Sequence, residues 1–101
     1  MTSRRVLFTA TARRHVHRER AWWLEHRAHP EIFVSEFEQA LMVLKLLPGA
    51  GHLYERAGVP GLRRVYVPKV ACHLYYTFAE DTVIVRALWG ARRERGPRLR
   101  P

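Results

Sequence analysis

Apolar residues recur with helical spacing in the first half of the chain, after a short strand. Residues 4–9 combine β-branched and aromatic side chains and predict that strand. Residues 12–29 contain no glycine or proline, and Thr11 is placed to cap a helix there. The apolar stripe of this helix is narrow, with arginine, histidine and glutamate around it. Its expected members are Ala12, Val16, Trp23 and Ala28.

A second helix is predicted after Pro30, which ends the first one and occupies a favoured early helical position. Its apolar residues recur mostly at intervals of three and four, so one face of the helix must pack on a core. Residues 48–61 are rich in glycine and proline and predict the end of the helix and a loop. The apolar stripe comprises Phe33, Phe37, Ala40, Leu41, Leu44 and Leu47.

Three apolar runs follow the loop, at residues 63–68, 72–78 and 83–89, and predict three strands. Residues 79–82 join the last two runs as a hairpin connection. The order predicts an α+β fold, β-α-α-β-β-β, in which two helices pack on one face of a small, mainly antiparallel sheet. The chain is long enough for one domain, with a basic and flexible tail expected at residues 90–101.

Period two sorts the residues of these strands onto two faces. Every second residue from Cys72 to Phe78 is apolar or aromatic, and this side is expected to face the helices. Cations interleaved with aromatic rings on the other side suit a phosphate backbone and stacked bases. The alternative is a solvated face of ordinary cross-strand partners. The outward residues are expected to be Arg64, Tyr66, His73, Tyr75 and Arg86.

The formal net charge is +9, with a sequence pI near 11.0, and it favours an acidic macromolecule as the partner. No apolar run reaches the length of a membrane span and no secretory signal is visible, so no membrane partner is expected. The single Cys72 suits a reducing cytosol. No phosphate loop, nucleophile elbow or carboxylate pair indicates a small-molecule enzyme, and no cofactor is expected. Metal binding is disfavoured because His15, His17, His26 and His29 lie among arginines.

The adjacent pair Trp22 and Trp23 cannot share the centre of one helical stripe, because neighbouring residues point about 100° apart. Trp23 is expected in the core. Trp22 is then either an anchor for a partner chain or a rim residue that covers the edge of the core.

The order of elements and four segments resemble the RelE/ParE superfamily of toxins from bacterial type II toxin–antitoxin systems. The resemblance covers nearly the whole chain. It implies a single RelE/ParE-like toxin domain over residues 1–101 and a cytoplasmic toxin in a hetero-oligomer with its antitoxin. The matching segments are Leu44–Gly51, Gly61–Val65, His73–Tyr76, and Val83–Trp89 followed by Arg92 and Arg93.

The superfamily has two branches with different targets. RelE-like members cut messenger RNA on the ribosome, and their functional positions fall on Arg64, Tyr66, His73, Arg93 and Leu99 of this chain. This resemblance implies His73 as base with the two arginines stabilising charge, but leucine at the last position supplies no acid. ParE-like members bind DNA gyrase without a catalytic set. That branch is also matched imperfectly, because Gly90 stands where many of its members have histidine.

We therefore favour a ParE-like toxin that binds DNA gyrase. The alternatives are a ribosome-dependent endoribonuclease acting through His73, Arg64 and Arg93, and a degenerate toxin that binds only antitoxin. Trp22, Arg63 and Tyr66 are the expected antitoxin contacts. The expected target contacts are Arg64, Tyr66, His73, Tyr75, Arg86, Arg92 and Arg93.

Overall fold

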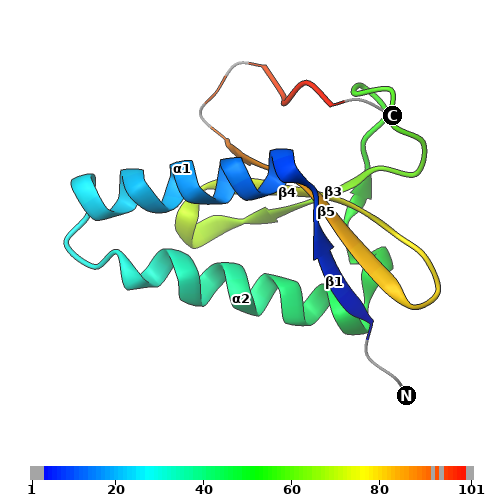
Figure 1. The fold of residues 1–101 in the computed structure, drawn as a ribbon, viewed down its shortest axis with the longest axis horizontal. Coiled ribbons are helices and arrows are strands. Elements are labelled where there is room, and N and C mark those ends of the chain that lie inside the picture. The colour runs from blue at the N-terminus through cyan, green and yellow to red at the C-terminus, as the bar shows by residue number, and fades with distance from the viewer. Residues whose placement is uncertain (1–3, 92, 94, 100–101) are drawn as a thin grey trace.

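Two helices lie side by side over one face of a five-stranded sheet in the computed structural model (Figure 1). The structure describes residues 4–91, 93 and 95–99. The strand order is β1-β5-β4-β3-β2, in which β1 runs parallel to β5 and the other neighbours are antiparallel. The α+β class is therefore confirmed. The elements are β1 (Arg5–Phe8), α1 (Ala10–His26), α2 (Glu31–Leu46), η1 (Pro48–Ala50), β2 (His52–Leu53), β3 (Arg63–Val67), η2 (Pro68–Val70), β4 (Cys72–Phe78) and β5 (Thr82–Gly90).

Strand β5 lies inside the sheet, next to the edge strand β1, and pairs with β1 on one side and with the middle strand β4 on the other. Its pairing with β4 slips by one residue, since Tyr76 faces Val85 but Tyr75 faces Ala87. Arg86 is the extra residue of this β-bulge. A one-residue slip exchanges the two faces of a strand. Beyond the bulge it turns Leu88 into the core and places Trp89 beside His73 on the opposite face.

A single residue, Thr9, separates β1 from α1, and the cap of the helix differs from the prediction. Thr9, not Thr11, is the N-cap: its backbone is extended, and its hydroxyl accepts a hydrogen bond from the backbone N–H of Ala12 at 3.1 Å. Thr11 already lies inside the helix. The helix ends at His26, because Arg27 is extended, so the expected core residue Ala28 lies outside it and is exposed.

The buried stripe of α1 contains two polar residues that apolar periodicity alone could not reveal. Ala12 and Trp23 are buried as predicted, and His15 and Glu19 lie between them at 9% and 6% exposure. The backbone N–H of Leu88 donates to Nδ1 of His15 at 3.3 Å, at the part of the β5 edge that β1 leaves unpaired. Glu19 accepts a bond from the Cys72 thiol at 3.8 Å. These contacts tie α1 to the sheet.

Helix α2 buries Phe33, Phe37 and Leu44 against the sheet, in agreement with the predicted stripe. Leu47 was wrongly assigned to the core. The helix ends at Leu46, and Leu47 adopts a non-helical backbone that leaves it 63% exposed. No helix in the described ranges of the chain is long and apolar enough to cross a bilayer.

A second, smaller apolar cluster lies on the face of the sheet that the helices do not cover. Its buried residues are Val59, Leu62, Tyr75 and Ala87. The long loop before β3 and the segment after β5 supply its partly buried members, and Figure 1 shows that segment crossing above the sheet. The face opposite the helices is therefore partly covered. The partly buried members are Tyr54, Ala57, Trp89 and Leu99.

The short strand β2 was not predicted, because it follows a glycine-rich turn and contains only two residues. The turn that leads into it is held by the buried Tyr76, whose hydroxyl donates to the carbonyl of Pro48 at 2.6 Å. The same hydroxyl accepts from the backbone N–H of Gly51 at 2.9 Å. A Cβ at Gly51 would lie 2.6 Å from this hydroxyl and 2.7 Å from the carbonyl oxygen of Arg64, so only glycine fits.

Candidate functional site

A row of aromatic rings crosses the sheet face opposite the helices and continues onto α1. Tyr66 of β3 is the cross-strand partner of His73 on β4, which in turn is the partner of Trp89 on β5. Ring centroids are 5.1 Å apart between Tyr66 and His73, and 5.3 Å apart between Trp89 and His15 of α1. We call these residues, Tyr66, His73, Trp89 and His15, the ring row.

Arginine side chains lie over several rings of this face. The guanidinium carbons of Arg18 and Arg93 lie 5.1 and 4.4 Å from the centroid of Trp89. Arg64 lies 4.8 Å from the centroid of Tyr54 and donates to the hydroxyl of Tyr75 at 3.4 Å. The face therefore joins planar rings with planar cations, a combination that suits phosphates and stacked bases.

The positive charge of the described residues is not neutralised by internal ion pairs. Within residues 4–91, 93 and 95–99, two ion pairs form: His29 with Glu31 at 3.2 Å and Lys69 with Glu36 at 3.3 Å. Neither involves an arginine. The guanidinium groups thus remain available to acidic groups of another molecule.

Both histidines of the ring row favour the neutral form. Burial, and secondly the charge of Arg64, lower the pKa of His73. Burial, followed by the charges of Arg18, Arg14 and Arg93, lowers the pKa of His15 to about 4. A neutral imidazole can accept a proton, so His73 retains the chemical capacity of a general base.

The structure brings most of the predicted outward residues together. Arg64, Tyr66 and His73 share the face opposite the helices, and Arg86 donates from Nε to the hydroxyl of Thr77 at 2.9 Å on that same face. Tyr75 lies on this face too, but the expectation that it is displayed is wrong. The ring of Tyr54 and the second apolar cluster cover it, and 1% of Tyr75 is exposed.

The expected residues near the end of the chain are only partly described. Arg93 stacks on Trp89, whose cross-strand partner is His73, so Trp89 separates the two predicted catalytic positions. Arg92 lies outside the described residues. Leu99 packs in the second apolar cluster. Gly90 is the last residue of β5, so the tail begins after it.

The three expected antitoxin contacts do not form one continuous surface. Trp22 lies near the end of α1, stacked on His26 at 4.6 Å, with Arg27 4.5 Å from its ring centroid. Arg63 pairs with Tyr76 on the helix side of β3, and it donates to the carbonyl of Gly51 at 2.8 Å. Tyr66 lies on the opposite side of the same strand.

Sequence reasoning missed Trp89, His15 and Arg18 as members of the site. His15 lies three residues after Ala12 on the buried stripe, so helical spacing contained a hint of its position. Trp89 could not be placed because the bulge at Arg86 reverses the faces of β5. No group of three or more metal-ligating side chains occurs in the part of the chain that the structure describes.

Comparison with solved structures identifies the fold. A chain of the "Chromosomal ParDE TA system from P. aeruginosa" superposes with a TM-score of 0.71, covering 89% of this chain and 98% of that chain. The two sequences are 13% identical. The likeness establishes a RelE/ParE-like fold, as the resemblance predicted. No protein-family model and no curated protein matches the sequence.

Proposed function

We propose that this chain is the toxin of a type II toxin–antitoxin system and that a cognate antitoxin neutralises it. The observation that carries the proposal is the cationic, ring-bearing face of a RelE/ParE-like sheet, whose arginines form no ion pair within the described residues. Such a face attracts acidic macromolecules over long range. The protein acts in the cytoplasm, where its single Cys72 is compatible with a reducing environment.

The site favours the ParE-like mode of action, in which the toxin binds and poisons DNA gyrase. Leu99 packs among apolar residues where a RelE-like toxin would need a proton donor. Binding, by contrast, needs only the exposed cations and rings. The proposed target contacts with described positions on this face are Arg64, Tyr66, His73, Arg86 and Arg93.

Purified toxin is expected to inhibit DNA supercoiling by gyrase at near-stoichiometric ratios. An Arg64→Gln/Arg93→Gln variant should need at least about tenfold more protein, because each charge-assisted contact contributes about 1.5–3 kcal/mol. Arg13→Gln/Arg20→Gln is the control, since it removes the same charge from exposed positions of α1. Supercoiling that stays intact at excess toxin would exclude gyrase as the target.

A ribosome-dependent endoribonuclease is the second candidate, supported by the lowered pKa of His73 beside Arg64. In this case His73 accepts the proton of the ribose 2′-hydroxyl, and Arg64 and Arg93 stabilise charge on the phosphate. A second experiment, in cells, tests this candidate beside the gyrase assay. Translated messenger RNA is sequenced after induction of the wild-type toxin or of His73→Ala. Cuts that disappear in the variant favour the nuclease. If gyrase stays active in the first assay and induced cells grow without arrest in the second, a degenerate toxin that binds only antitoxin is favoured.

We propose that the antitoxin contacts Trp22 and passes around the edge of β3. Strand β2 pairs with Arg63 and Arg64 of β3. The rest of β3, residues 65–67, has no partner in β2 along this edge. A partner segment crossing that edge can touch both Arg63 and Tyr66, which lie on opposite faces. An acidic segment would also offset the +9 charge.

Truncation of Trp22 to alanine should weaken the antitoxin complex by about tenfold or more, as expected for an aromatic anchor. The binding partner for this test is the product of a short acidic reading frame adjacent to the toxin gene. Leu24→Ala is the matched control, because Leu24 is on the same helix and 61% exposed. Unchanged affinity of the Trp22 variant, measured by calorimetry on a folded protein, would rule out this anchor.

A further inference from the structure

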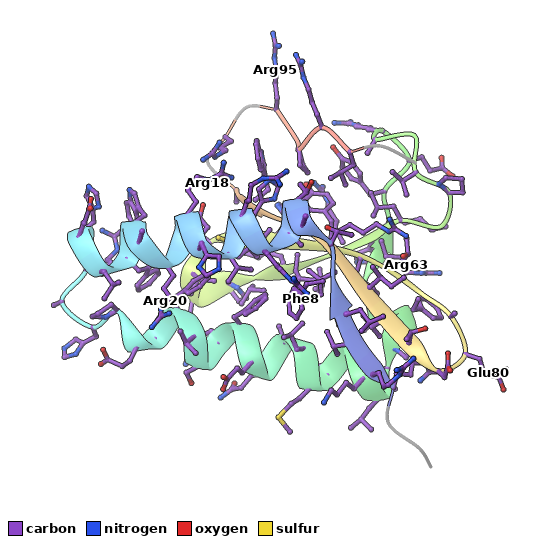
Figure 2. The ribbon with its side chains drawn as sticks, viewed as in Figure 1. Phe8, Arg18, Arg20, Arg63, Glu80 and Arg95 are labelled. Carbon is purple, nitrogen blue, oxygen red and sulfur yellow. The ribbon has the colours of Figure 1, made fainter. Side chains whose placement is uncertain are left out.

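A cleft of about 890 Å³ opens between α1, β5 and the segment that follows β5. Figure 2 shows Arg18 on the side of α1 that faces this segment and Arg95 on the segment itself, whereas Arg20 lies on the side of α1 toward α2. The volume is typical of a small-molecule site. The cleft is lined by Thr9, Thr11, Arg14, His15, Arg18, Arg86, Trp89, Arg95, Gly96, Arg98 and Leu99.

Five arginines from three separate segments line this one cleft. Arg14 and Arg18 are one helical turn apart on α1, Arg86 comes from the bulge of β5, and Arg95 and Arg98 come from the segment after it. Among the residues that the structure describes, no aspartate or glutamate lines the cleft. One guanidinium group can donate two parallel hydrogen bonds to the oxygens of a phosphate. Five such groups therefore suit a ligand with several negative charges close together.

The surroundings of the arginines add further donors for an anion. Thr9 is the N-cap of α1 and Thr11 lies in its first turn, so both lie at the positive end of the helix dipole. Nδ1 of His15 accepts from the Leu88 N–H, which leaves the proton of the neutral ring on Nε2 as a donor. The described lining of the cleft therefore presents donors and no carboxylate.

The cleft is shaped for one compact ligand more than for a nucleic acid strand. The segment after β5 closes one side, since Pro97 is buried and Leu99 packs in the second apolar cluster. A strand needs an open path with its phosphates spread along it. We propose that this cleft binds a ligand with adjacent phosphate groups, either a nucleoside triphosphate or inorganic triphosphate. This ligand goes beyond the proposed toxin function: the cleft shares Arg86 with the proposed target contacts, but Arg14 and Arg18, which the test changes, are not among those contacts.

Isothermal titration of the full chain with ATP, without magnesium, and with inorganic triphosphate tests the proposal. Both are expected to bind at an ionic strength of about 0.15 M, where screening suppresses weak surface attraction. Arg14→Gln/Arg18→Gln should weaken binding by about 100-fold, or tenfold for each lost charge-assisted contact. Arg13→Gln/Arg20→Gln removes the same charge from the same helix without touching the cleft, and it should retain most of the affinity.

The two ligands separate the sources of the phosphates. Tighter binding of ATP means that the nucleoside also contacts the cleft, and equal binding means that the phosphates alone are recognised. The proposal is wrong if both double variants lose affinity equally, because net charge then explains the attraction. It is also overturned if neither ligand binds, or if a single-stranded oligonucleotide displaces triphosphate and shows the same dependence on Arg14 and Arg18.

Discussion

Replacing Tyr76 with phenylalanine is expected to lower the free energy of unfolding by about 2–5 kcal/mol, because two buried backbone groups lose their partner at once. The Tyr76 hydroxyl donates to the carbonyl of Pro48 at 2.6 Å and accepts from the N–H of Gly51 at 2.9 Å. Both groups belong to buried residues that water does not reach in the folded protein. The ring itself is retained, so the loss reports the hydroxyl and not a cavity.

Urea unfolding followed by tryptophan fluorescence measures this loss as a lower midpoint at an unchanged slope. Tyr66→Phe is the control, since Tyr66 is 47% exposed and its hydroxyl bonds no buried backbone group among the described residues. It should change stability by less than about 0.5 kcal/mol. Equal midpoints for the Tyr76 variant and wild type would show that the Pro48 and Gly51 groups find other partners.

The protein is expected to lose up to about 3 kcal/mol of stability as the pH falls from 6.5 to 4, through His15 alone. The folded state holds the pKa of His15 at about 4, against 6.5 in the unfolded chain. Between these values the unfolded state binds the extra proton. The contribution is therefore fully present above pH 6.5 and is lost as the pH falls toward 4.

His15→Asn removes this titration, and its amide oxygen can still accept from the N–H of Leu88. Stability of both proteins is measured by urea unfolding from pH 7 to pH 4. As the pH falls, the free energy of unfolding of the wild type should decrease relative to that of the variant. Any contribution of His73, whose pKa is also lowered, is present in both proteins and cancels in the comparison. Parallel curves would mean that His15 is protonated as easily in the folded state as in the unfolded one.

Most of the fold could be predicted because hydrophobic periodicity and local chain geometry point to the same elements. Phe33, Phe37 and Leu44 recur at helical spacing, and they are the residues that α2 buries. Strand β2 could not be predicted, because its two residues are held by pairing with Arg63 and Arg64 and the turn before it is held by Tyr76, all distant in sequence. The cap at Thr9 was missed since two threonines lie close together and only the end of β1 selects between them.

The candidate site was predicted where it depends on strand alternation and missed where it depends on tertiary packing. Period two placed Arg64, Tyr66 and His73 on one face correctly. The same period assigns Trp89 to the wrong face of the sheet unless the bulge at Arg86 is known. No local sequence feature predicts that bulge. The burial of Tyr75 likewise depends on the loop before β3 and on the segment after β5, which are distant from Tyr75 in sequence.

The pairing of the first strand with the last has a consequence for biosynthesis. Arg5 of β1 is aligned with Thr82 of β5, so β1 pairs with a strand that is synthesised long after it. A nascent chain that has not yet released β5 from the ribosome lacks the strand on which β1, β4 and α1 all assemble. Translation therefore has to pass β5 before the ring row can form, and a product that stops before Thr82 lacks the strand that carries Trp89.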